Sequence, residues 1–239
     1  MTIHWKSVTE STNLDARSGV HGDVFAADYQ TAGRGRLDHR WESAHGLNLM
    51  FSAVFNVSGV APQEVATFPL VTGLAIAETV EVMCPELAGH VAVKWPNDVL
   101  VDGRKLAGIL CERNGECVIA GVGLNVNQCD FPEEIAARAT SLSLLCGRDF
   151  DRTVVLDALV KALYEAHGTW MCSGFAAFRE AFSAKDALRG RSVSVRQTDS
   201  DAAPVGGLCE GVQSDGSLLV GGERIYAGEA HVSSFCTCV

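Results

Sequence analysis

The chain has 239 residues, of which 47% are hydrophobic and 20% are charged, and these proportions exclude a disordered or fibrous protein. Its formal net charge of −10 means that the average surface repels nucleic acid and anionic membranes, so neither DNA nor a membrane is an expected partner. The sequence has no uninterrupted run of about 18 apolar residues, so no membrane-spanning helix is expected. The N-terminus also lacks the apolar stretch of a signal peptide. We therefore expect a cytoplasmic protein.

The nine cysteines are spread from Cys84 to Cys238, in an odd number and without a C-x-x-C pair. That spacing predicts neither a disulfide framework nor a zinc site. The seven histidines include no H-E-x-x-H motif, which argues further against a metalloenzyme. We therefore expect reduced thiols, including those of the closest pair, Cys236 and Cys238.

Apolar periodicity and turn residues predict alternating strands and helices in the first half of the chain. Serine, threonine and asparagine are favoured at helix starts, and a proline inside a helical pattern splits or kinks the helix, here at Pro69. The expected elements are a strand over 3–8, a short helix from Ser11-Thr12-Asn13 to Gly19, a strand over 24–29, an irregular loop over 31–38, a strand over 48–57 and a helix from Pro62 to near Pro85.

The second half predicts hairpins, two helices and a separate group of short strands. Asp102-Gly103 and Asn114-Gly115 predict tight turns, so the strands that flank them pair antiparallel. Evenly spaced short strands after Gly190 predict a small β-barrel of about 50 residues. The expected elements are strands over 91–94, 106–111 and 117–126, helices over 154–172 and 175–182, and strands over 192–196, 208–212, 217–220 and 231–234.

The order of these elements predicts an α+β fold, in which a mixed or antiparallel sheet is backed by helices and is followed by the small barrel. We place the domain boundary so that residues 1–188 form the larger domain and residues 189–239 form the smaller one.

Three short segments carry the chemistry. Gly33-Arg34-Gly35-Arg36 combines glycines, which let the backbone approach a ligand, with arginines, which suit carboxylate and phosphate oxygens. Lys94-Trp95-Pro96-Asn97-Asp98 places a lysine at the end of an apolar strand, where its ammonium suits a phosphate. Gly121-Val122-Gly123-Leu124-Asn125 puts glycines inside a strand, which indicates that a ligand or another backbone lies against it. Taken singly, the first segment is also explained as a solvated basic hairpin and the second as a surface lysine that ends a strand.

The common nucleotide-binding motifs are absent. Val126 and Asp38 stand where the third glycine of a dinucleotide fingerprint would lie, and there is no P-loop sequence. However, residues 33–41 and 93–106 together carry six basic and three acidic residues, which reverses the charge balance of the whole chain. This local reversal predicts an anion pocket that suits a nucleoside triphosphate.

Five segments, in their order and spacing, resemble the biotin–protein ligases of the cytoplasmic bacterial type. The segments are Ser11-Thr12-Asn13, Gln30 to Arg36 with Trp41, Lys94 to Asp98, Arg104 to Ile109, and Gly121 to Asn125. The resemblance implies a class II synthetase-like catalytic domain followed by an SH3-like β-barrel. It also implies an enzyme that uses ATP and Mg²⁺ to convert biotin to biotinyl-5′-AMP, and that passes the biotinyl group to a lysine of a biotin carboxyl carrier domain of a carboxylase. The acceptor subunit and the oligomeric state, monomer or homodimer, stay open.

The resemblance further implies roles for individual residues. Arg36 and Lys94 are the implied catalytic residues, because they would neutralise the carboxylate of biotin and the α-phosphate of ATP. The implied biotin site comprises Ser11, Thr12, Asn13, Gln30, Gly33, Arg34, Arg36, Lys94, Gly121 and Gly123. The implied ATP site comprises Arg36, Trp41, Asn48, Lys94, Lys105 and Asn125. The ligands of the metal ion are not indicated.

The chain departs from the family pattern at Leu37-Asp38-His39-Arg40, where members often carry a glycine and a further basic residue, and Asp38 there opposes phosphate. Some members carry an N-terminal DNA-binding domain, which is not expected here because the first strand begins within three residues of Met1. Two alternatives remain. One is a lipoate–protein ligase, whose Arg-Arg-x-Ser-Gly-Gly-Gly segment is absent, and the other is a non-catalytic biotin-binding protein, which would not need both Arg36 and Lys94.

Overall fold

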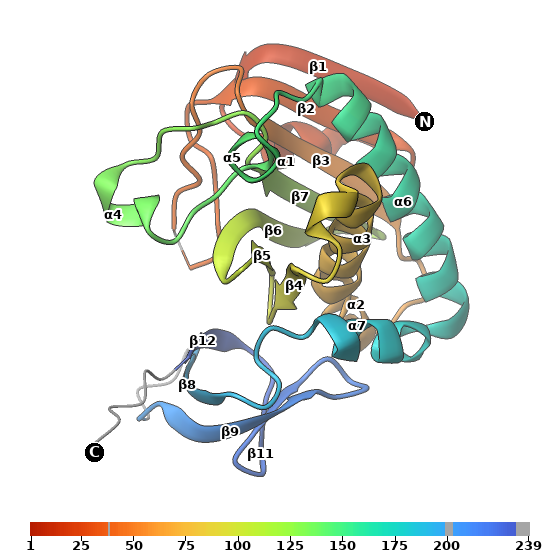
Figure 1. The fold of residues 1–239 in the computed structure, drawn as a ribbon. Coiled ribbons are helices and arrows are strands. Elements are labelled where there is room, and N and C mark those ends of the chain that lie inside the picture. The colour runs from red at the N-terminus through yellow and green to blue at the C-terminus, as the bar shows by residue number, and fades with distance from the viewer. Residues whose placement is uncertain (38, 199–202, 233–239) are drawn as a thin grey trace.

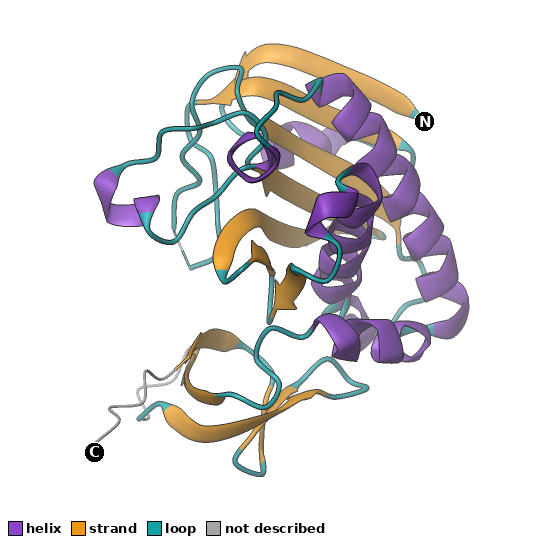
Figure 2. Cartoon of the chain, viewed as in Figure 1, coloured by secondary structure: helices purple, strands orange, loops and turns teal. Residues whose placement is uncertain are grey.

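A computed structural model describes residues 1–37, 39–198 and 203–232 of the chain. The polypeptide forms a large mixed sheet, two long helices that cover one face of that sheet, and a smaller antiparallel sheet from the C-terminal residues (Figures 1 and 2). This arrangement confirms the α+β prediction.

The large sheet has seven strands, of which β1 and β2 pair in parallel and the other neighbours pair antiparallel. The turn predicted at Asp102-Gly103 is confirmed, since both residues have the positive φ, 48° and 78°, that a two-residue hairpin turn requires. The strand that enters this turn was not predicted. The strand order is β1 (Thr2–Thr9), β2 (Asp23–Gln30), β3 (Leu49–Asn56), β7 (Cys117–Leu124), β6 (Arg104–Asn114), β5 (Asp98–Val101) and β4 (Val91–Lys94).

The predicted helix from Pro62 is divided into α2 (Pro62–Val65) and α3 (Phe68–Met83). Pro69 lies in the first turn of α3, where a missing N–H costs no hydrogen bond. The helices predicted over 154–172 and 175–182 are confirmed, whereas two short helices, α4 and α5, were not predicted. The remaining helices are α1 (Thr12–Asp15), η1 (Ala16–Ser18), η2 (Pro85–Leu87), α4 (Glu133–Ala136), α5 (Leu142–Cys146), α6 (Arg152–Ser173), η3 (Phe175–Phe178) and α7 (Arg179–Lys185).

By length and composition alone, the segment Pro62–Met83 could cross a membrane, and its most apolar 18-residue window has a mean hydropathy of 1.4. In the structure 72% of that 18-residue stretch within Pro62–Met83 is buried, so it is a core helix. A Cβ added to Gly73 would lie 2.9 Å from Val93 Cγ1, so α3 packs closely on β4. A helix that is apolar on every side is typical of the centre of a protein core.

The two faces of the large sheet differ in what covers them. On β7, Val118, Ala120 and Val122 point into the main core with α3 and α6. Ile119 points the other way and packs with Ala16 and Val54 in a separate, smaller cluster. Because side chains alternate along a strand, Gly121 and Gly123 also lie on this second face. The glycine motif therefore lies on the face of the sheet that the long helices do not cover.

The C-terminal residues form an open five-stranded sheet among the described residues, so the predicted closed barrel is not found there. This sheet shares the main core and is also joined to the large sheet by Trp95 Nε1, which donates to the Gly216 carbonyl at 3.0 Å. The division into domains at residue 189 stays a prediction. The strand order is β11 (Glu223–Ile225), β10 (Leu218–Val220), β9 (Val205–Val212), β8 (Ser192–Gln197) and β12 (Gly228–Val232).

An ion pair between Asp28 on β2 and Arg152 at the start of α6 joins the sheet to its covering helix at 2.8 Å. Burial alone would raise the pKa of Asp28, but hydrogen bonds from Arg152 and Trp5 and the charge of Arg152 hold that pKa below its ordinary value. Because the pKa of Asp28 is lower in the folded than in the unfolded chain, its ionisation stabilises the fold at pH values above the ordinary pKa of about 3.9. This stabilisation is lost as the pH falls through the pKa of Asp28 in the folded protein.

We expect Asp28→Asn to reduce the free energy of unfolding by about 1 kcal/mol at pH 7, because it removes the charge of a partly exposed pair. Urea unfolding at pH 7 and in acid measures the effect, and the difference between wild type and variant should vanish once Asp28 is protonated. A difference of the same size at both pH values would contradict this account.

Candidate active site

One row of paired residues crosses the face of the large sheet that carries the glycine motif. Lys94 pairs with Asp98, Asp98 with Gly108, and Gly108 with Gly123. Residues that are directly opposite one another point to the same face of a sheet. The row therefore places two charged side chains next to two positions that have no side chain.

The loop after β2 reaches this row as a small hairpin rather than the irregular segment that was predicted. Gly35 N donates to the His39 carbonyl at 2.7 Å, and Trp41 N donates to the Gly33 carbonyl at 3.0 Å. A Cβ on Gly33 would collide with the carbonyl oxygen of Trp41, so a larger residue does not fit there. Asp38, whose charge departs from the family pattern, lies outside the described residues.

The indole of Trp41 lies on the glycine row. A Cβ on Gly123 would collide with the indole ring, and a Cβ on Gly108 would lie 3.0 Å from it. Lys105 Nζ lies over the same ring, 5.6 Å from its centroid. Trp41 Nε1 is buried and has no hydrogen-bond partner among the described residues. The space that the glycines leave free is thus filled by an aromatic side chain whose polar atom is unpaired.

Three cations lie near Asp98, and one of them, Lys105, forms an ion pair with its carboxylate. Lys105 Nζ lies 2.7 Å from Asp98 Oδ1, and Lys94 is the direct strand partner of Asp98. Arg36 Nη1 donates to the Gly228 carbonyl at 3.3 Å, which joins the loop to the C-terminal sheet. Burial lowers the pKa of Arg36, while the charges of Glu229 and Asp98 act in the opposite direction, and a guanidinium stays charged under such conditions.

A cavity of about 590 Å³ opens beside Arg36. It is lined by Trp95 and Leu110 from the large sheet and by Gly216 and Tyr226 from the C-terminal sheet. Of the three cations, Arg36 lines this space, which Pro69 and Leu70 of α3 also border.

A polar network lies further along the same face, where α1 crosses β3 and β7. Thr12 N and Thr12 Oγ1 donate to Gln30 Oε1 at 2.7 and 3.1 Å. Ser52 Oγ lies 2.8 Å from Thr12 Oγ1 and 2.6 Å from Asn13 Oδ1. Asn13 Nδ2 donates to Glu112 Oε2 at 2.7 Å, and a Cβ on Gly121 would collide with the Asn13 amide. Ser11, Thr12, Asn13 and Ser52 are all buried.

Arg34 extends this network to solvent. Arg34 Nη1 lies 3.2 Å from Glu112 Oε1, and Arg17 Nη2 lies 3.6 Å from the same oxygen. Of these residues, Ser52 and Glu112 were not predicted as site residues. A single serine within the apolar strand 49–56 was the available signal for Ser52, whereas Glu112 is recognisable only from its spatial neighbours.

Asn48 and Asn125 are buried, and their side-chain amides hydrogen-bond to the loops that contain Ser43, Val126 and Thr140. Asn48 is fully buried, and its amide contacts Val126 N at 3.0 Å and Ser43 Oγ at 3.1 Å. Asn125 Nδ2 donates to the Thr140 carbonyl at 3.0 Å. The structure thus brings Arg36, Lys94, Lys105 and Trp41 together at the surface of the site and gives the two asparagines partners within the protein.

Comparison with known proteins gives a consistent result. The model of the biotin/lipoate A/B protein ligase family matches residues 5–127. A biotin–[acetyl-CoA-carboxylase] ligase of Paracoccus denitrificans is 31% identical over 226 residues, which cover 90% of this chain and 92% of the relative. The chain belongs to the biotin/lipoate A/B protein ligase family. The range that the family model matches contains the glycine row, the loop with Arg36 and the network around Thr12, but not Gly228.

Other members of the family extend the likeness to the C-terminal sheet. The bifunctional ligase/repressor BirA of Bacillus subtilis is 30% identical over 236 residues, which cover 94% of this chain and 69% of the relative. The solved biotin protein ligase of Aquifex aeolicus, in complex with biotin and ATP, is 30% identical with a TM-score of 0.84 and covers 97% of this chain and 98% of its own. The likeness to this solved structure thus includes both the large sheet and the C-terminal sheet that border the site.

Proposed function

We propose that this chain is an ATP-dependent biotin–protein ligase that activates biotin as biotinyl-5′-AMP and transfers the biotinyl group to a lysine of a carboxylase's biotin carboxyl carrier domain. The observation that carries this proposal is the placement of Arg36 and Lys94 around Asp98, at one end of a glycine row that continues to a buried polar network. Relatives with biotin ligase names and a neighbour solved with biotin and ATP support the choice of substrates.

The first step must bring two anions together. The carboxylate of biotin attacks the α-phosphate of ATP, a new C–O–P bond forms and pyrophosphate leaves. Two unit charges about 3 Å apart repel by about 5 kcal/mol at an effective dielectric constant near 20. Fixed cations such as Arg36 and Lys94 offset that repulsion, and they act most strongly as the bridging oxygen forms. Holding both reactants in line lowers the barrier further.

The buried network supplies a site for the polar end of biotin. A ureido group has two N–H donors and one carbonyl acceptor, and the hydroxyl and amide groups of Ser11, Thr12, Asn13 and Gln30 can pair with both kinds. In this proposal Gly33 and Arg34 would lie at the solvent side of the ureido group, and Gly121 and Gly123 would form the floor beneath the rings. The sheet thus offers a polar end, a flat apolar middle and a cationic end in the order that biotin requires.

ATP would lie at the cationic end. Lys94 and Lys105 would contact the phosphates, and Trp41 would cover the adenylate. Asn48 and Asn125 would act by positioning the strand ends, since their amides are already hydrogen-bonded within the protein. Mg²⁺ is held largely by phosphate oxygens in such sites, and the carboxylate of Asp98 is an oxygen ligand of the kind that it prefers. When bound, the ion would neutralise phosphate charge.

A ring of biotin can rest on Gly123 only if the indole of Trp41 moves away from it. We therefore expect biotin, with or without ATP, to change the intrinsic tryptophan fluorescence, because the environment of a buried indole changes. Fluorescence titration of the wild type and of Trp41→Phe measures this, and calorimetry reports biotin binding independently. A biotin-dependent change of equal size in Trp41→Phe would show that Trp41 stays in place.

Two alternatives are less well supported. A lipoate–protein ligase belongs to the same family, but the Arg-Arg-x-Ser-Gly-Gly-Gly segment is absent. A non-catalytic biotin-binding protein would not need cations beside the site for its carboxylate and phosphate. We further propose a cytoplasmic location and no role for DNA or membranes, in line with the net charge of −10.

Biotin transfer tests the proposed function as a whole. The purified chain is incubated with ATP, Mg²⁺, biotin and a biotin carboxyl carrier domain, and the mass of the carrier is measured. We expect the mass to increase by one biotinyl group, and we expect no increase when the acceptor lysine is replaced by arginine. No modification of the carrier, together with tight binding of biotin, would instead favour the non-catalytic alternative.

A further inference from the structure

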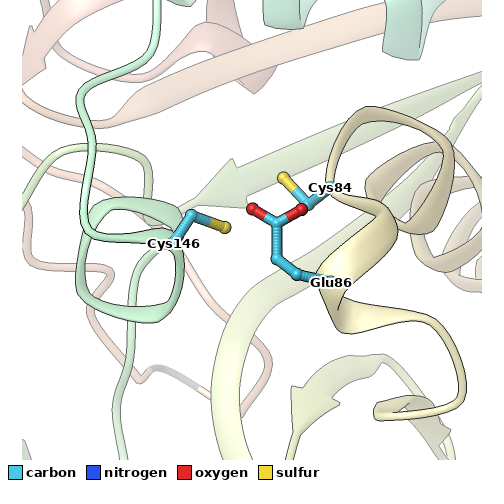
Figure 3. Close-up of side chains that lie close together, drawn as sticks. All are labelled: Cys84, Glu86 and Cys146. Atoms are coloured by element: carbon cyan, nitrogen blue, oxygen red, sulfur yellow. The ribbon is translucent and has the colours of Figure 1, made fainter.

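Two thiols and one carboxylate converge at a place remote from the glycine row. Cys84 follows the last residue of α3, Glu86 lies in η2, and Cys146 ends α5. The two sulfur atoms and one carboxylate oxygen all lie within 4.8 Å of one another. Figure 3 shows the three side chains pointing toward one shared space, Cys84 and Glu86 from one segment of the chain and Cys146 from another. The seven described cysteines are free thiols, as the sequence predicted.

We propose that Cys84, Cys146 and Glu86 bind one zinc ion, with water as the fourth ligand. Zinc prefers sulfur, nitrogen and carboxylate ligands in a tetrahedral arrangement, with Zn–S distances of about 2.3 Å and Zn–O distances of about 2.0 Å. Such a tetrahedron separates its ligand atoms by about 3.5 to 3.8 Å. The three atoms observed here are already within about 1 Å of that spacing, so small side-chain rotations suffice.

The charges around the three side chains favour a divalent ion. Binding of Zn²⁺ displaces one proton from each thiol, which leaves two thiolates and one carboxylate. Arg148 Nη2 lies 3.7 Å from Glu86 Oε1 and adds one positive charge. Three negative charges are then balanced by zinc and Arg148.

The exposure of the three residues leaves a path for the ion. Cys84 is fully buried, Cys146 is half-buried and Glu86 is exposed. Zinc can therefore enter from the side of Glu86, and a water molecule can complete its shell there. The site is accessible without any opening of the main core.

The proposed ion would connect the end of α3 with the segment that supports the active site. Lys105 N donates to the Arg138 carbonyl at 2.7 Å, and Thr140 N donates to the Lys105 carbonyl at 3.0 Å. Leu142, the first residue of α5, donates its N–H to the Asn125 carbonyl at 3.2 Å. Zinc would hold α5, and with it the backbone around Lys105 and Asn125, against the rest of the fold. This role is structural and does not depend on the proposed function.

Metal titration of the whole chain tests the proposal. The protein is stripped of metal with a chelator under reducing conditions, and zinc affinity is measured by competition with a chromophoric chelator. Cobalt replaces zinc for spectroscopy. We expect one equivalent of metal, with a thiolate-to-cobalt charge-transfer band and the visible bands of tetrahedral cobalt. Cys146→Ser should weaken zinc binding by about tenfold or more, since even the loss of a group outside the ligand set often costs that much.

Three further variants make the result specific. Glu86→Gln changes an exposed side chain, so it should fold, and it should weaken zinc binding while the thiolate band remains. Cys172→Ser removes an exposed cysteine elsewhere and should leave binding unchanged. The double variant Cys236→Ser/Cys238→Ser should also bind as the wild type does. Zinc affinity that is unaffected by both Cys146→Ser and Glu86→Gln, or that is lost with the tail cysteines, would overturn the proposal, as would a wild type that binds no metal.

Discussion

Replacement of Arg36 by alanine is expected to reduce biotin-dependent exchange of pyrophosphate into ATP by about 10²- to 10³-fold, while the protein stays folded. The loss corresponds to about 3 to 4 kcal/mol, which is typical when one fixed group that stabilises developing charge is removed. The fold should survive because the guanidinium makes one 3.3 Å hydrogen bond, to the Gly228 carbonyl on the C-terminal sheet. Labelled-pyrophosphate exchange measures the rate, and thermal unfolding measures the fold.

Arg40→Ala is the matched control for this variant. Arg40 lies in the same hairpin and carries the same charge, but its guanidinium is exposed and donates to the Thr31 carbonyl at 3.2 Å. We expect its exchange rate to stay within a fewfold of that of the wild type. Equal losses in the two variants would mean that the net charge of the loop, rather than the position of Arg36, controls the reaction.

Replacement of Lys94 by alanine is expected to reduce the exchange rate by about 10²-fold. Lys94 ends β4 opposite Asp98, so its backbone stays paired when the side chain is shortened. In the proposed reaction the ammonium is the second fixed cation beside the carboxylate and the α-phosphate, and its removal would leave Arg36 to offset their repulsion alone. Initial rates over a range of biotin and ATP concentrations separate weaker binding from slower chemistry.

Lys161→Ala provides the comparison for Lys94. Lys161 is an exposed residue of α6, on the helical side of the large sheet, and it carries the same charge. Its replacement should leave the exchange rate unchanged, and Lys94→Arg should recover part of the rate that Lys94→Ala loses, because a guanidinium is charged but differently shaped. An alanine variant of Lys94 with the rate of the wild type would exclude Lys94 from the reaction.

Most of the fold could be predicted from local sequence signals. Asp102-Gly103 required a tight turn, and the positive φ of both residues confirms it. A partly alternating pattern predicted β1, apolar runs predicted β2, β3 and β7, and Pro69 predicted the division between α2 and α3. These features depend on backbone sterics and burial within a few residues, and a sequence window contains that information.

The features that the sequence did not predict depend on tertiary contacts. β5 is only four residues long and becomes a strand because β4 and β6 pair with both of its edges. The loop with Arg36 is ordered as a hairpin through its contacts with Trp41. A closed barrel would require the two outer strands of the C-terminal sheet, β11 and β12, to pair with each other. Composition does not encode whether such distant strands pair, and in the described residues they do not.

The candidate site shows the same division. Arg36, Lys94 and the glycines of β7 were predicted from motifs whose residues are neighbours in sequence. Ser52 and Glu112 join the polar network only through contacts that span 40 and 99 residues. The proposed zinc ligands, Cys84 and Cys146, are likewise too far apart for any spacing rule, and this is why the cysteine pattern predicted no zinc site.

The central step of the proposed reaction is the joining of biotin to the α-phosphate of ATP. Exchange of labelled pyrophosphate into ATP by the purified wild-type chain, measured with biotin, with lipoate and with neither, tests that step in isolation from any carrier protein. We expect rapid exchange with biotin and background rates in the other two reactions. Exchange that requires lipoate, or no exchange with biotin under conditions in which the chain is folded and binds biotin, would contradict the account.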